Sequence, residues 1–173
     1  MDNSTNLTFM FAFDDIKPVL PSFSFEPIDI NGTICALIDR SLFREVAEVL
    51  KARFGFTHLI DILGSERGGR SMRFEVTYNL RNPETKERIF LKTRCDERDP
   101  HVPSVVSVWS GANWNEREAF DMYGIIFDEH PDMRRMYMPD DFEYYPLRKD
   151  FPLMGVEGSI PLPNAQAHEL SKN

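Results

Sequence analysis

Cysteine is scarce in this chain of 173 residues, which contains only Cys35 and Cys95. Two widely separated thiols cannot form a disulfide framework, and they are too few for a four-thiolate metal site on this chain alone. We therefore expect a reducing compartment and no metal site built by this chain.

Basic residues are not in excess either. The chain has 20 Lys and Arg residues against 28 Asp and Glu residues, so its formal net charge is −8. Nucleic-acid binding requires a basic surface that contacts phosphates, so the composition argues against a nucleic-acid partner. A run of about 18 to 20 apolar residues is also absent, and the sequence therefore predicts no transmembrane helix.

Familiar catalytic motifs are missing as well. The sequence contains no HExxH, Walker loop, GxGxxG, GxSxG or paired CxxC pattern. Glu116, Glu118 or Asp121 could act as an acid or base with His130 in a free-standing hydrolase, but their spacing is unpersuasive. His130 precedes Pro131 in a loop, which is more typical of a histidine that holds backbone or a carboxylate. We predict no catalytic, cofactor-binding or metal-binding residue on this chain.

Hydrophobic periodicity predicts an α+β fold: an antiparallel or mixed β-sheet with helices packed on it, followed by an extended, loop-like C-terminal arm. A strand is expected over 34–38, a helix over 42–54 that stops at Gly55, and an antiparallel meander over 56–95. Six prolines after residue 130 exclude long helices and central strands there. The predicted parts are an N-terminal arm (1–32), an α+β domain (33–124) and a partner-docking C-terminal arm (125–173).

The stretch from Glu116 to Asp150 interleaves charged and aromatic side chains almost residue by residue. Ten of the 21 aromatic residues of the chain lie between Trp109 and Phe151. Aromatic residues, Met and Arg are enriched at protein interfaces. The composition therefore predicts a docking element rather than a pocket.

A helix is expected at the start of this stretch, with Asn113 and Glu116 forming a capping box and Gly124 ending it. Helical projection places Arg117 and Asp121 on a charged side and Glu116 among apolar residues. A carboxylate in that position needs a cation or several donors, which predicts a partly buried ion network with nearby arginines. The alternative is a capping glutamate beside a solvated run of charges.

Several short motifs follow one another in this stretch: Glu116-Arg117-Glu118, Asp121-Met122-Tyr123-Gly124, His130-Pro131, Arg134-Arg135 and Pro146-Leu147-Arg148-Lys149-Asp150. In this order they resemble the thirty-kilodalton subunit family of respiratory complex I. In bacteria this family is the C subunit of the proton-pumping NADH:quinone oxidoreductase. The resemblance is strongest from Asn113 to Leu153. We assign the motif residues to a partner interface or to the structure that supports it: Glu116, Arg117, Glu118, Asp121, Tyr123, Gly124, His130, Pro131, Arg134, Arg135, Pro146, Arg148, Lys149 and Asp150.

The resemblance implies a peripheral-arm subunit that does no chemistry and supports the forty-nine-kilodalton D subunit. Electrons would pass from NADH to quinone through FMN and iron–sulfur clusters on other subunits, at the cytoplasmic face of the bacterial inner membrane. The equivalent subunit of a hydrogenase- or ferredoxin-linked membrane complex and the hydrolase described above are the alternatives. Residues 1–32 and 155–173 carry no family motif that can be transferred.

Overall fold

The computed structural model of the chain describes residues 11–30, 33–68, 71–152 and 155–156. Its centre is a mixed five-stranded sheet in the order β1-β2-β5-β4-β3. Only the pairing of β2 with β5 is parallel among these strands. The strands are β1 (Phe25–Ile30), β2 (Thr33–Ile38), β3 (His58–Glu66), β4 (Phe74–Arg81) and β5 (Arg88–Cys95). The α+β prediction and the antiparallel meander β3-β4-β5 are confirmed.

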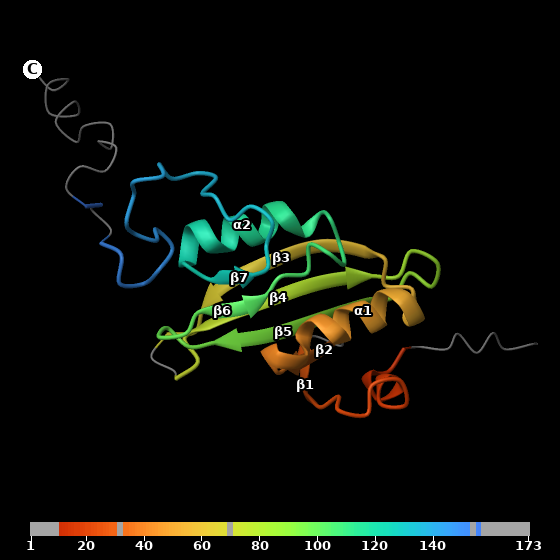
Figure 1. The fold of residues 1–173 in the computed structure, drawn as a ribbon. Coiled ribbons are helices and arrows are strands. Elements are labelled where there is room, and N and C mark those ends of the chain that lie inside the picture. The colour runs from red at the N-terminus through yellow and green to blue at the C-terminus, as the bar shows by residue number, and fades with distance from the viewer. Residues whose placement is uncertain (1–10, 31–32, 69–70, 153–154, 157–173) are drawn as a thin grey trace, which may run out of the picture.

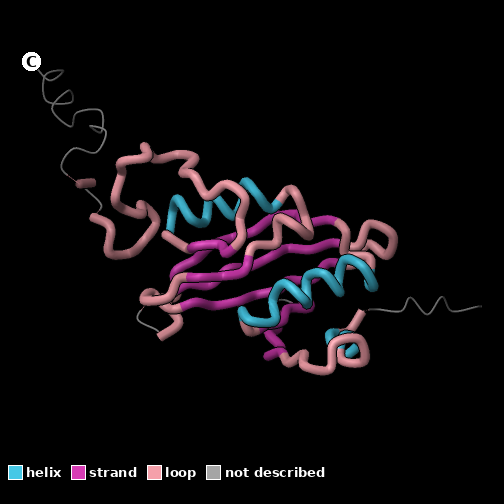
Figure 2. The backbone as a smooth tube through the Cα atoms, in the orientation of Figure 1, coloured by secondary structure: helices cyan, strands magenta, loops and turns pink. Residues whose placement is uncertain are grey.

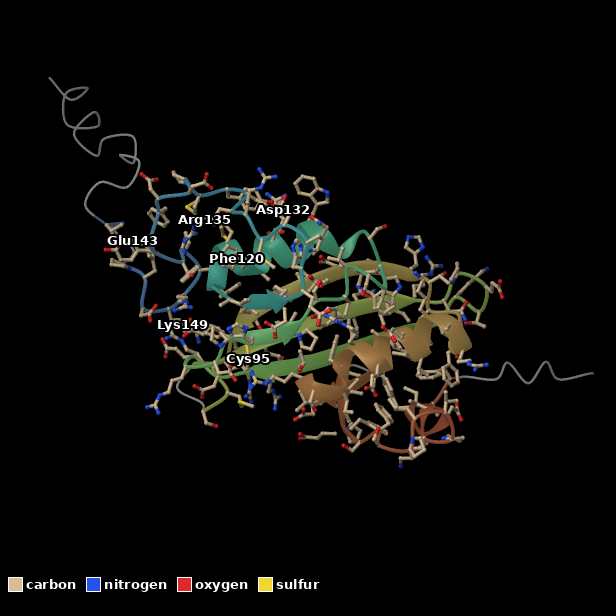
Figure 3. The ribbon with its side chains drawn as sticks, viewed as in Figure 1. Cys95, Phe120, Asp132, Arg135, Glu143 and Lys149 are labelled. Carbon is tan, nitrogen blue, oxygen red and sulfur yellow. The ribbon has the colours of Figure 1, made fainter. Side chains whose placement is uncertain are left out.

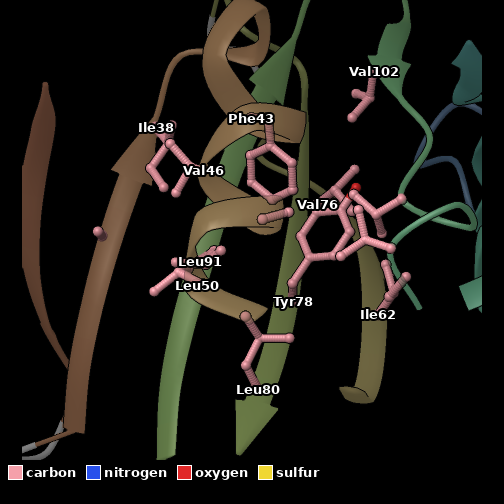
Figure 4. Packing of buried hydrophobic residues seen from close by; sticks show 14 of the residues in the cluster. Ile38, Phe43, Val46, Leu50, Ile62, Val76, Tyr78, Leu80, Leu91 and Val102 are labelled. Carbon is pink, nitrogen blue, oxygen red and sulfur yellow. The ribbon is translucent and has the colours of Figure 1, made fainter. Parts of the chain in front are cut away.

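Helix α1 (Phe43–Phe54) packs on one face of this sheet (Figure 4). Phe43, Val46 and Leu50 recur at three- and four-residue steps and have no exposed surface. The ring of Phe43 lies 4.4 Å from that of Tyr78 in β4, between ring centroids. Gly55 ends the helix with φ of 72°, a left-handed conformation that glycine adopts without strain.

Helix α2 (Ala112–Tyr123) covers the same face, beside β3. The approach is close because Gly64 has no side chain: a Cβ atom there would lie 2.9 Å from Cδ2 of Tyr123 and 3.3 Å from Cβ of Ala119. Gly64 pairs with Val76, and Val76 shares a sheet face with Tyr78. Both helices are therefore on one side of the sheet.

A second, two-stranded sheet lies between the helices (Figure 1). Its strands, β6 (His101–Pro103) and β7 (Ile126–Asp128), are parallel, and α2 connects them. Arg44 of α1 donates to the backbone oxygens of Ser104 and Asp128, just after β6 and at the end of β7. Strand β7 therefore joins the folded domain, although residues 125–128 were expected to begin the C-terminal arm.

The opposite face of the main sheet is polar. Glu75 of β4 is 7% exposed and accepts hydrogen bonds from Lys92 (2.7 Å) and Arg94 (2.8 Å) of β5. Burial by itself would raise the pKa of Glu75, but these two cations hold it below its usual value. The charged side chains thus satisfy one another across neighbouring strands.

The expectation of an irregular lead-in through residue 32 is wrong for the segment that forms β1. Pro27 is compatible with this strand because β1 is at the edge of the sheet. Before it, the short 3-10 helix η1 (Phe13–Ile16) buries both of its terminal residues in the core. Phe11 packs edge-on against Phe54 and Phe56. Residues 1–10 and 31–32 are outside the described residues.

After β7 the described chain contains no helix or strand, as the proline content predicts (Figure 2). Residues 129–152 run as a loop along the outer side of α2 and then reach the end of the main sheet where β3 and β4 are joined. Among the described residues, no helix combines the length and apolarity that crossing a bilayer requires.

Candidate functional site

Glu116 is inside the fold, with no exposed surface. Its carboxylate accepts hydrogen bonds from the hydroxyl of Ser104 (2.7 Å) and the N–H of Val105 (2.8 Å). The capping-box prediction is wrong, because α2 begins at Ala112 after Gly111 and Glu116 faces the β6 turn instead of the helix start. In the described chain no Lys or Arg forms an ion pair with Glu116, so burial raises its pKa to about 7.

His130 holds backbone, as its sequence context predicts. Its Nδ1 accepts from the N–H of Asp132 at 3.0 Å, so Nε2 carries the proton and donates to the carbonyl of Asn113 at 3.2 Å. Burial lowers the pKa of His130, which favours this neutral form. The side chains of His130 and Glu116 lie 4.0 Å apart with no solvent-exposed surface. A hydrolase that used this pair would have to open the fold to admit a substrate.

Asp121 organises the loop that runs over α2. One oxygen accepts from three consecutive N–H groups, those of Met136 (3.0 Å), Tyr137 (2.7 Å) and Met138 (3.1 Å), and the other accepts from Arg135 at 2.7 Å. Burial alone would raise the pKa of Asp121, but these donors lower it. The predicted buried ion network therefore exists at Asp121 and Arg135, and not at Glu116.

Arg135 also ties the loop together through its guanidinium. Its Cζ atom lies 5.1 Å from the ring centroid of Tyr145, 5.9 Å from that of Phe142 and 6.0 Å from that of Phe120 on α2. Figure 3 shows Arg135 beside Phe120, with Glu143 further along the loop. One cation thus joins the helix to two turns of the loop.

Arg117 is buried under the same loop, which covers the charged side of the helix where projection placed this residue. Its guanidinium donates to the carbonyls of Arg134 (2.9 Å) and Arg135 (3.2 Å) and lies 5.0 Å from the ring of Trp114. Arg134 itself points outward and pairs with Asp132 at 2.7 Å.

The Pro146–Asp150 motif is fastened to the end of the main sheet. Arg148 donates to the carbonyl of Tyr123 at 2.7 Å, and its guanidinium lies 4.4 Å from the ring centroid of Tyr145. A Cβ atom at Gly124, whose φ is 75°, would lie 2.6 Å from Arg148 Nη2, so glycine is required there.

The next two residues continue this attachment. The N–H of Lys149 donates to Glu66 at 2.6 Å, and Asp150 accepts from Arg73 at 2.7 Å. Arg73 also donates to Glu66 at 2.9 Å and pairs with Glu97. We call the set Glu66, Arg73, Lys149 and Asp150 the clasp. Sequence reasoning missed Arg73 and Glu66, since nothing in a strand sequence indicates a contact more than 70 positions away.

The remaining motif residues are at the surface. Glu118 and Pro131 are exposed and Pro146 is half-buried, beside the exposed Leu147. Sequence reasoning did not single out Tyr137, which is 58% exposed, or assign a site role to Trp114, which is 62% exposed. Their aromatic character was the available signal. The ions therefore fold the loop onto its own domain, and the large apolar side chains on its outer side are what a partner could contact.

Comparison with known proteins gives a family match and several relatives. Residues 36–157 match the model of the family described as respiratory-chain NADH dehydrogenase, 30 Kd subunit. The chain is 38% identical over 159 residues to the C subunit of NADH-quinone oxidoreductase from Roseiflexus sp. (strain RS-1), covering 91% of this chain and 88% of that protein. It is 54% identical over 127 residues to the C subunit of the Maricaulis maris (strain MCS10) enzyme, covering 72% and 63%.

A third relative is longer. The second C/D-type subunit of NADH-quinone oxidoreductase from Aquifex aeolicus (strain VF5) is 39% identical over 127 residues, which are 73% of this chain and 21% of that protein. In several relatives, including the one from Maricaulis maris, this chain spans less than two thirds of the full length.

Two solved structures share the fold. The trypsin-resistant fragment of Nqo5 has 31% sequence identity and a TM-score of 0.62, covering 69% of this chain and 97% of that one. A chain of the archaeal membrane-bound sulfane sulfur reductase complex has a TM-score of 0.69 at 23% identity, covering 82% and 84%, which is a likeness of fold alone. The family model spans most of the sheet, both helices and the clasp, and the chain belongs to the respiratory-chain NADH dehydrogenase 30 kDa subunit family.

Proposed function

We propose that this chain is a non-catalytic peripheral-arm subunit of NADH:quinone oxidoreductase, and that it supports the adjacent D-type, forty-nine-kilodalton subunit. In this role it holds its partner in the geometry that electron transfer from NADH to quinone requires. FMN and the iron–sulfur clusters are then carried by other subunits, and the chain works at the cytoplasmic face of the bacterial inner membrane.

The observation that carries this proposal is the Aquifex aeolicus relative. There the part similar to this chain occupies 21% of a polypeptide whose name combines the C and D subunits. A covalent link keeps the two parts at high effective concentration, which is useful only if they function side by side. A separate C-type chain must achieve the same proximity through its surface.

The chemistry of the two cysteines supports the assignment of the clusters to other subunits. Cluster ligation requires thiolates. Both cysteines are buried, and burial raises the pKa of Cys35 and raises that of Cys95 to about 12. The two residues also lie on opposite faces of the sheet, because Cys35 pairs with Phe90 while Cys95 pairs with the core residue Phe74. Cluster binding would require both to move.

The test is purification of the assembly through a tag on this chain, in mild detergent, from cells in which the tagged copy replaces the original. We expect flavin and iron–sulfur absorbance, NADH oxidation with quinone as acceptor, and a D-type subunit in equal amount. A colourless monomer would overturn the proposal. Recovery of a hydrogenase- or ferredoxin-linked assembly without an NADH-oxidising subunit would assign the chain to the related class of complex.

A further inference from the structure

Two aromatic side chains are conspicuous on the outer side of α2 and the loop that covers it. Trp114, in the first turn of α2, is 62% exposed, and Tyr137, in the loop, is 58% exposed. Tyr144 and Leu147 follow along the same loop and are also exposed. Tryptophan and tyrosine dominate the binding energy of protein interfaces when a partner covers them.

Both aromatic residues are held in place by the buried ions. Arg117, fixed by the carbonyls of Arg134 and Arg135, lies 5.0 Å from the Trp114 ring. The backbone of Tyr137 is fixed by the carboxylate of Asp121 at 2.7 Å. Binding through such residues loses little conformational entropy, because their supports are ordered before the partner arrives.

The exposed charged side chains near these rings that lack an ion-pair partner in the described chain are negatively charged. Four exposed carboxylates, those of Glu118, Asp140, Asp141 and Glu143, take part in no hydrogen bond or ion pair in the described part of the chain. The arginines of this region offset them only in part. Arg117 and Arg135 point inward, and Arg134, which also attracts Asp140 electrostatically, is paired with Asp132. Asp132 and Glu143 lie along the outer side of the loop in Figure 3.

We infer that this surface, defined by Trp114, Glu118, Tyr137, Asp140, Asp141 and Glu143, docks a basic, arginine- and lysine-bearing face of the partner protein. The inference rests on the proposed function, and it makes the D-type subunit the occupant. Guanidinium and ammonium groups suit both components of the surface, since they pair with carboxylates and stack on aromatic faces. Membrane phosphates and nucleic acids do not, since their charge has the same sign as the surface.

The experiment compares variants of the tagged full chain in the native complex. The aromatic variant carries Trp114→Ala with Tyr137→Ala, and the charge variant carries Glu118→Lys, Asp140→Lys, Asp141→Lys and Glu143→Lys. Leu63→Ala and Glu84→Lys are matched controls, because both residues are exposed and lie away from this surface, on β3 and in the β4–β5 turn. Circular dichroism of each purified chain checks that the fold is kept.

The readout is the amount of D-type subunit and flavin that each chain retains during washing. We expect the aromatic variant to dissociate at least about tenfold faster than wild type, at low and high salt alike. At low salt, the charge variant should retain at least about tenfold less D-type subunit and flavin than wild type. At about 0.5 M salt, the difference in retention between the two proteins should be smaller. Both controls should behave as wild type.

The outcomes separate the two proposals. If wild type retains the redox assembly and both variants retain it equally well, this surface is not the docking site, although the proposed function stands. If wild type brings down no redox assembly, the proposed function itself fails. A stable dimer of the chain that Trp114→Ala dissociates would make a second copy the occupant and overturn the inference. Capture of anionic vesicles or RNA by wild type, lost in the charge variant, would overturn it too.

Discussion

Glu116 is a buried carboxyl group that accepts two hydrogen bonds and forms no ion pair with a Lys or Arg among the described residues. Its pKa of about 7 in the folded chain lies above the ordinary value of 4.5. Between these values the folded state binds more protons than the unfolded state. The stabilisation from this group is therefore complete below pH 4.5 and is lost as the pH rises through 7.

Replacing Glu116 by Gln removes this titration while keeping the size of the side chain and its ability to accept from Val105. Between about pH 4.5 and 8, the free energy of unfolding should decrease more in wild type than in the variant. The expected difference between the two decreases is on the order of 3 kcal/mol. Denaturant unfolding at a series of pH values measures the difference. Glu118→Gln, on the exposed side of the same helix, is the control. Parallel curves for wild type and Glu116→Gln would contradict the assignment.

At the residue scale, the sequence indicated which side of helix α2 a residue occupies, but not which groups that residue contacts. Helical projection correctly placed Glu116 among apolar residues. A carboxylate in such a position requires hydrogen-bond donors. The donors belong to Ser104 and Val105, in a turn whose contact with α2 depends on how β6 and β7 pair. Projection likewise placed Arg117 and Asp121 together on a charged side of the helix, but it cannot reveal that a loop covers that side.

Among the elements, the contact between β3 and α2 depends on Gly64. Gly64→Ala would place a methyl group 2.9 Å from the ring of Tyr123 and 3.3 Å from Ala119, so the helix or the ring must shift. We expect a loss of about 1 to 3 kcal/mol in the free energy of unfolding. Gly111→Ala is the matched control: a Cβ there meets no atom within 4 Å, so only the weaker N-cap preference of alanine acts, and stability should stay within about 1 kcal/mol of wild type. Equal effects of the two substitutions would refute the close-packing argument.

The clasp makes a second prediction about elements. Arg73→Ala removes the donor shared by Glu66, Glu97 and Asp150, so the attachment of residues 146–151 to the sheet should weaken. The amides of Leu147 and Phe151 donate hydrogen bonds to the carbonyls of Met122 and Arg148, respectively. Hydrogen exchange at these two amides should become at least about tenfold faster. Arg98→Ala is the control, since Arg98 is exposed nearby and its side chain forms no ion pair in the described chain. Unchanged exchange in Arg73→Ala would mean that the clasp does not hold this segment.

Elements with clean periodicity were predictable, and elements defined by distant pairing were not. Strand β4 alternates apolar and polar residues, and α1 has a single apolar face and a glycine stop, so both were found. Strand β1 was missed because its proline suggested an irregular segment. The parallel pairs β2–β5 and β6–β7 join residues far apart in the chain, and no local pattern encodes such a pairing.

At the scale of the whole molecule, the sheet domain and the loop after β7 should differ in resistance to protease. In the isolated chain, trypsin should cut at Arg134 or Lys149, which are exposed, before it cuts within β4, β5 or α2, whose backbones are paired. Mass spectrometry of timed samples gives the order of the cuts. Trypsin should cut the loop several-fold more slowly in the assembled complex than in the isolated chain, which serves as the control. First cleavage inside the sheet would contradict this division.

Strand β2 lies at an interior position of the sheet, yet the strand that completes it on one side is β5, with Cys35 opposite Phe90. During synthesis the β1–β2 hairpin therefore emerges from the ribosome well before its inner neighbour exists. Until Cys95 has left the exit tunnel, the inner edge of β2 has no complete strand to pair with. Growth of this polypeptide thus contains an interval in which an unpaired strand edge is open to wrong pairing, and the interval lasts until the last residue of β5 has emerged.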